Sequence, residues 1–164
     1  MSEQGSKESR LYLNKSNIHK VEPPILSIDY GTKNIGLAIT DKKGIVAQPL
    51  TTIKVKDNNY EKFFSKLSKI IKDYEIETLV LGIPQTFKED HLQNMNRILE
   101  FRSSIKKMTG REVFLYDESY STSDSYSMLR AQGQSQKKSR QKIDKIAASR
   151  FLQELVDFKN RKNE

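Results

Sequence analysis

Two apolar runs joined by a polar turn make up residues 25–40 of this chain of 164 residues. Both runs are rich in Ile and Leu and have the length of a β-strand, and Gly31 and Gly36 bound the turn between them. The pattern predicts a β-hairpin with Asp29 at the end of its first strand. A carboxylate there has two interpretations. It caps the turn, or it forms part of a hydrolytic site, because the strand holds its backbone while one face of the residue stays open.

The rest of the chain alternates between strand and helix patterns. Strands are expected at residues 45–53, 78–84 and 113–116, and helices at residues 60–74, 92–108, 119–130 and 143–157. Short turns join the first three strands, which favours an antiparallel meander. The continuous apolar runs of the last two favour buried parallel strands. The prediction is an α/β domain with a mixed five-stranded sheet flanked by helices.

The domain is expected at residues 25–158, followed by a polar tail at residues 159–164. Residues 1–24 are rich in Ser, Glu, Lys and Asn and end in two prolines, so we expect them to be mostly disordered. Within them the apolar residues Leu11, Tyr12, Leu13 and Ile18 are expected to dock. The chain has no Cys, no apolar run of about 18 residues and no signal peptide pattern, which favours a cytoplasmic protein without a membrane span.

The chain is basic, with a net charge of +8. A positive charge of this size raises affinity for nucleic acid through phosphate contacts and counterion release, although lysine also serves simply to keep proteins soluble. Residues 131–142 are predicted to form an exposed, mobile loop. This loop carries Lys137, Lys138, Arg140 and Lys142. The lysines of the helix at residues 60–74 are expected to form a solvated face instead.

Acidic residues follow two of the predicted strands and begin the last helix. They are Asp29, the pair Asp117 and Glu118, and Asp144. Parallel strands linked by helices end at the same edge of a sheet, and successive strand residues point to opposite faces, so one member of the pair is expected to be structural. Asp144 is either a member of a functional cluster with these acids or a structural residue, because the helix dipole favours a carboxylate in the first turn of a helix.

A cluster of such carboxylates would need a cation to offset its repulsion. Oxygen ligands without nearby His or Cys select Mg²⁺ or Mn²⁺. Two such ions can activate water and stabilise the leaving oxygen when a phosphodiester is cleaved. Lys33, beside Asp29, and the cations of the predicted loop would then contact the nucleic acid backbone.

The order of the elements resembles a ribonuclease H-like fold, and the chain more specifically resembles the YqgF/RuvX family. The residues that carry the resemblance are 28–38, 47–50, 80–84, 116–118, 121–122 and 143–148. The resemblance implies that Asp29, Glu118 and Asp144 are the catalytic and metal-binding positions, with Asp117 as a neighbour. It also implies cleavage of RNA or DNA in the bacterial cytoplasm, usually to mature the 5′ end of pre-16S rRNA.

One departure from the family pattern concerns Ser119, which stands where the family usually has an arginine. Serine cannot replace a planar charged donor, so substrate preference and activity are open to test. Two alternatives therefore stay open: a Holliday junction resolvase that cuts branched DNA, and a ribosome-assembly protein that binds nucleic acid with an idle site. A monomer or a weak homodimer is expected, and resolution of a symmetric junction would need the dimer.

Overall fold

The computed structural model describes residues 12–83, 91–117 and 136–162, and among these it describes only the backbone of residues 91–94, 117, 136–145 and 162. The strands are β1 (Ile25–Asp29), β2 (Asn34–Thr40), β3 (Ala47–Lys54), β4 (Thr78–Ile83) and β5 (Val113–Asp117). The helices are η1 (Ile18–Lys20), α2 (Glu61–Asp73), α3 (His91–Thr109) and α5 (Gln136–Lys162). None of the described helices is long and apolar enough to cross a lipid bilayer.

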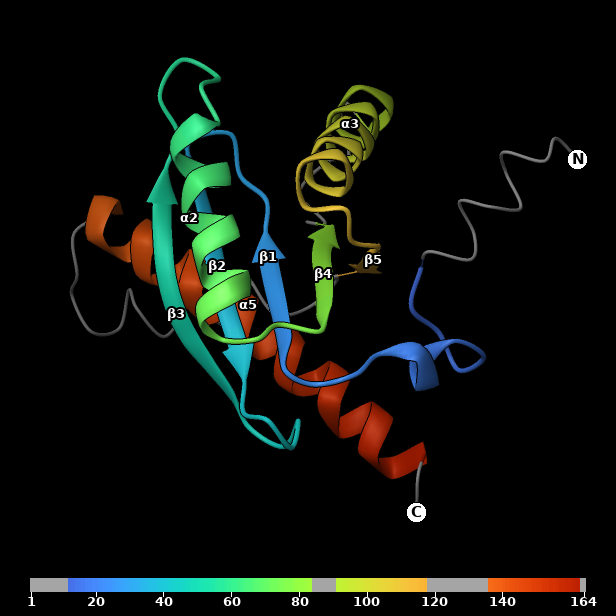
Figure 1. The fold of residues 1–164 in the computed structure, drawn as a ribbon. Helices are drawn as coiled ribbons and strands as arrows, with labels where there is room; N and C mark the ends of the chain where they lie inside the picture. The colour runs from blue at the N-terminus through green and yellow to red at the C-terminus, as the bar shows by residue number, and fades with distance from the viewer. Residues whose placement is uncertain (1–11, 84–90, 118–135, 163–164) are drawn as a thin grey trace, which may run out of the picture.

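The strands form one sheet in the order β3-β2-β1-β4-β5, with β1 in the centre (Figure 1). β1 pairs with β2 and β2 with β3 in antiparallel fashion, whereas β1, β4 and β5 run parallel. The predicted mixed five-stranded sheet is therefore confirmed. The parallel strands also bring the ends of β1, β4 and β5 to one edge of the sheet.

Side chains of β1 alternate between two apolar layers on opposite faces of the sheet. Leu26 and Ile28 belong to a buried cluster that includes residues of α2 and α3. Ile25 belongs to a second buried cluster, which includes Phe151 and Leu155 of α5. Figure 1 shows α2 and α5 on opposite sides of the sheet. The period-2 alternation of a strand thus assigns each residue of β1 to one layer.

Polar contacts fix the direction of α5 across the sheet. Ser27 on β1 donates a hydrogen bond from Oγ to the carbonyl of Ala148 at 2.9 Å. Farther along α5, the amide of Asn160 donates to the carbonyl of Gly44, in the β2–β3 turn, at 3.2 Å. Because that turn lies beside the beginning of β1, α5 runs opposite to β1. The earlier turns of α5 therefore lie toward the end of β1.

The predicted mobile loop at residues 131–142 is wrong from Gln136 onward, because α5 begins there. Lys, Arg and Gln are good helix formers, and no Gly or Pro follows Gly133. A solvent-facing helical turn needs no apolar residue, so a helix can form over a polar stretch of this kind. Residues 131–135 and the predicted helix at residues 119–130 lie outside the described residues.

Residues 12–24 pack against the domain, so the expected docking of Tyr12, Leu13 and Ile18 is confirmed, whereas the expected disorder of residues 1–24 does not hold for this part. Tyr12 forms a bridge to Leu115 of β5, and the N–H of Leu13 donates to the Leu115 carbonyl at 2.9 Å. Ile18 and Val21 are buried in the apolar layer beneath α5. The unpaired edge of β5 and the open end of this layer therefore offer the segment enough contacts to become ordered. Residues 1–11 are outside the described part of the chain.

Arg102 of α3 ties that helix to β5. Its Nε donates to the Val113 carbonyl at 2.7 Å, and its Nη2 donates to Glu112 at 2.6 Å. We expect Arg102→Met to lower the free energy of unfolding by about 1–3 kcal/mol, because a buried carbonyl loses a charged donor. Urea unfolding measures this change. Lys106→Met is the control, since Lys106 contacts the same Glu112 at 3.3 Å but is exposed; an equal loss in both variants would contradict the assignment.

Asp41 caps the turn between β2 and β3. Its Oδ1 accepts hydrogen bonds from the N–H groups of Ile45 and Val46, at 2.8 and 3.0 Å, and these bonds hold the pKa of the carboxyl below its usual value. A lowered pKa gives stability that is present above the ordinary pKa and is lost as pH falls through the folded-state value. Asp41→Ala should therefore be less stable than the parent at neutral pH. Urea unfolding at decreasing pH should show this difference shrinking, and a difference that grows in acid would refute the assignment.

Candidate active site

Asp29 ends β1 at the edge of the sheet where the parallel strands terminate. The turn that follows needs Gly31, because a Cβ at that position would clash with the carbonyl oxygen of Asn34. Asp29 is 9% exposed. Strand alternation places it on the same face as Ser27, which is the face covered by α5. The hairpin predicted from the sequence thus holds this carboxylate on the central strand.

Glycines flank Asp29 on both neighbouring strands. In the register of the sheet, Asp29 is paired with Gly36 of β2 and with Gly82 of β4. Both glycines are buried and have no side chain to occupy the space beside the carboxylate. The two neighbouring strands therefore place no side chain directly beside Asp29 in the register of the sheet.

The end of β5 lies at the same edge, as the sequence predicted. Gly82 is paired with Tyr116, so Asp29, Gly82 and Tyr116 form one row across the sheet, and Asp117 is one residue farther along. The backbones of β1 and β5 are two strand spacings apart, roughly 10 Å. The side chain of Asp117 and all of Glu118 lie outside the described residues, so the choice between these two acids stays a prediction.

Asp144 lies inside α5 rather than at its beginning. The helix starts at Gln136, two turns earlier, so the explanation of Asp144 by the dipole of the first turn is wrong. Asp144 precedes Ala148 by four residues, about 6 Å along a helix, and Asp29 follows Ser27 by two residues, a similar distance along a strand. Because Ser27 contacts Ala148 and the two elements run in opposite directions, the helical turn of Asp144 lies near the level of Asp29.

No group of three or more His, Cys, Asp or Glu side chains suited to a metal ion occurs among the described residues. Of the three predicted ligands, only Asp29 has a described side chain. The glycine-flanked carboxylate, together with the backbone placement of Asp144 and of the end of β5, fits a hard cation with oxygen ligands.

The predicted nucleic-acid contacts lie toward the same edge. Lys33 is exposed in the turn directly after Asp29, and its carbonyl accepts a hydrogen bond from Val55 at 2.7 Å, which fixes the turn. The other predicted cations, Lys137, Lys138, Arg140 and Lys142, belong to the first two turns of α5. The direction of α5 therefore brings their backbone toward the end of β1, before Asp144.

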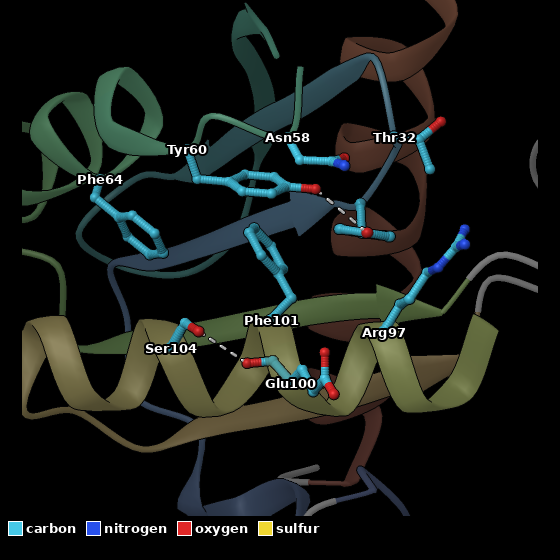
Figure 2. A pocket seen from close by; sticks show the side chains of 9 residues that line it. Thr32, Asn58, Tyr60, Phe64, Arg97, Glu100, Phe101 and Ser104 are labelled. Atoms are coloured by element: carbon cyan, nitrogen blue, oxygen red, sulfur yellow. Dashed lines mark hydrogen bonds between the residues drawn. The ribbon is translucent and has the colours of Figure 1, made fainter. Parts of the chain in front are cut away.

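A cavity of about 560 Å³ opens beside Tyr30, on the face of the sheet opposite α5 (Figure 2). Its lining includes Tyr30, Tyr60, Phe64, Arg97, Glu100 and Phe101. The ring centroid of Phe101 is 4.8 Å from that of Tyr30 and 5.4 Å from that of Tyr60, and the two tyrosine hydroxyls are 3.5 Å apart. Burial and the bond to Tyr60 raise the pKa of Tyr30, so its phenol stays neutral.

Tyr30 directly follows Asp29 in the sequence, but no local sequence pattern predicts this cavity. Arg97 and Phe101 are one turn apart on α3, and only the fold brings them opposite Tyr60. Tyr116, on β5, stacks on Phe151 of α5 with a centroid distance of 5.5 Å and so packs within the domain.

Three comparisons with known proteins bear on this site. The sequence model of the RuvX family, described as a Holliday junction resolvase, matches residues 24–157. Proteins named "Putative pre-16S rRNA nuclease" from Bacillus thuringiensis (strain Al Hakam) and Bacillus cereus (strain AH820) are each 33% identical over 135 residues, 82% of this chain and 98% of theirs.

The structure of T. thermophilus RuvC in complex with a Holliday junction substrate has a similar fold. The TM-score is 0.50 at 13% identity, over 85% of this chain and 94% of the RuvC chain, and at this identity the likeness concerns the fold alone. The family match, by contrast, spans most of the chain, and the Bacillus relatives align over nearly their whole length. The chain therefore belongs to the RuvX family of nucleases and has the ribonuclease H-like fold that its sequence predicted.

Proposed function

We propose that this protein is a metal-dependent nuclease that hydrolyses phosphodiester bonds to mature the 5′ end of pre-16S rRNA. The observation that carries the proposal is the buried Asp29 between two glycines at the end of the central strand. The substrate is taken from the names of the relatives that are 33% identical to this chain. The proposal places the reaction in the cytoplasm, as a step of ribosome biogenesis, carried out by a monomer or a weak homodimer.

In this proposal Asp29, Glu118 and Asp144 hold Mg²⁺ or Mn²⁺, with Asp117 nearby. Bound there, the metal would supply an activated water and stabilisation of the leaving oxygen. The role of the protein fold is to orient the carboxylate that would hold the metal. Pairing of β1 on both sides fixes the backbone of Asp29, so its carboxylate is held in place before substrate arrives.

The basic residues attract and align the substrate. Lys33 is exposed in the turn after Asp29, and the first two turns of α5 contribute four further cations. Contacts from these side chains to phosphates would set the strand across the sheet edge, and their strength would depend on salt.

A second candidate, cleavage of branched DNA, is favoured by the family description and by the RuvC-like fold. It differs from the first in its substrate and in its need for a dimer on a symmetric junction. A third, a binding protein with an idle site, follows from Ser119 in place of an arginine. One assay separates all three.

Asp29→Asn should reduce metal-dependent cleavage of a labelled pre-16S rRNA 5′ leader by about 100-fold or more, because loss of a ligand charge removes several kcal/mol of transition-state stabilisation. The assay compares Mg²⁺, Mn²⁺ and chelator, with a synthetic four-way DNA junction in parallel. Binding at low salt and thermal unfolding should be nearly unchanged. Full activity of the variant would refute the proposal, cutting of the junction alone would favour the resolvase, and binding without any cutting would favour the idle site.

Replacing Lys137, Lys138 and Arg140 together by Gln should weaken RNA binding and flatten its salt dependence. Each lost phosphate contact on a single strand lowers the slope of log K against log salt by about 0.7, so the triple variant should lose up to about 2. The matched control replaces Lys62, Lys66 and Lys69, which are exposed on α2. Equal losses in the two triple variants would show that only net charge matters.

A further inference from the structure

We propose that the cavity beside Tyr30 binds a nucleobase from a single-stranded part of the substrate. The inference rests on the proposed nuclease function for its choice of ligand, and it assigns a second contact to the same substrate strand. It is carried by the position of the cavity, its aromatic lining and its polar groups.

The cavity and the candidate catalytic acid share one strand end. Asp29 and Tyr30 are consecutive, and the alternation of β1 sends them to opposite faces of the sheet. Thr32, in the turn after β1, also lines the cavity, and Figure 2 shows it with Arg97 near the end of the strand. A nucleic acid strand whose phosphate lies at Asp29 can therefore turn a neighbouring base into the cavity.

Aromatic side chains provide a surface for stacking. Tyr60 and Phe64 are half-buried, so part of each ring faces solvent at the cavity, and Phe101 packs behind them. The centroids of Phe64 and Phe101 are 6.4 Å apart. Every base has a π-face, so stacking on such rings favours single-stranded RNA or DNA without strong sequence preference.

Polar groups around the rings match the edge of a base better than an apolar ligand. Arg97 and Glu100 are exposed, lie three residues apart on α3 and border the cavity with Asn58 (Figure 2). A guanidinium can donate to a base carbonyl or a phosphate, and a carboxylate can accept from an exocyclic amine. The volume of about 560 Å³ is that of a small-ligand site. An aliphatic ligand would make no use of the hydrogen-bonding groups of Arg97 and Glu100.

The test uses the full chain in chelator, so that binding is measured without cleavage. The probes are two single-stranded oligoribonucleotides of the same length, one with 2-aminopurine at one position and one with an abasic site there. Tyr60→Leu and Arg97→Gln should each weaken binding of the first probe by about tenfold and should abolish the preference over the abasic probe. Quenching of 2-aminopurine fluorescence should fall in parallel.

Two matched variants lie outside the cavity. Tyr74→Leu removes a tyrosine that is 46% exposed at the end of α2, and Lys107→Gln removes an exposed cation of α3. Both should bind the probes within twofold of the parent. The inference is overturned if the cavity variants bind like these controls, or if they lose equal affinity for both probes. Arg97 is exposed, so its variant tests the cavity without disturbing the core.

Failure of this inference differs from failure of the proposed function. If the cavity variants keep the base preference while the parent cuts RNA in a metal-dependent way, the cavity is not the base site and the nuclease stands. If base preference depends on Tyr60 and Arg97 while no variant or parent cuts with metal, the cavity inference holds and the nuclease proposal falls.

Discussion

The burial of β1 on both faces is the constraint on which the rest of the structure depends. Leu26 and Ile28 are fully buried on one side and Ile25 on the other. Burial of each such side chain contributes about 1.5–3 kcal/mol of stability. A shift of β1 by one residue in register would turn the side chains of each face to the opposite face. The same alternation sends Asp29 to the face of α5 and Tyr30 to the face of α2 and α3. One strand end therefore serves two sites.

The arrangement of α5 follows from this constraint. Ser27 can bond to the backbone of α5 only because it alternates with Leu26 and Ile28. That bond and the contact of Asn160 with the β2–β3 turn orient the helix, so that its basic first turns lie toward the end of β1. The helix thereby links the packing of the core to the part of the chain that would meet phosphate.

Local patterns were sufficient to predict the mixed sheet and the position of Asp29 at the end of the first strand. Helix α2 has a strong helical period of apolar residues and α3 a weaker one. The continuous apolar runs of β4 and β5 favoured buried parallel strands. The start of α5 was missed because its first turns contain no apolar residue, and periodicity does not detect a solvated helix. The docking of residues 12–24 was underestimated because it depends on the exposed edge of β5, which composition does not reveal.

The cavity could not be predicted for a different reason. Tyr60 lies just before α2, whereas Arg97 and Phe101 lie one turn apart on α3, and each residue has an ordinary role in its own segment. Only tertiary packing brings them together. The position of Asp29 was predictable because strand, turn and acid are adjacent in the sequence. Its catalytic role and the convergence of Glu118 and Asp144 on it stay predictions.

The most direct test of the central claim is manganese anomalous scattering from crystals grown with Mn²⁺. The account predicts a peak about 2.1 Å from a carboxylate oxygen of Asp29, with oxygens of Glu118 and Asp144 as further ligands. A peak bound elsewhere, with Glu118 and Asp144 directed away from Asp29, would contradict the account.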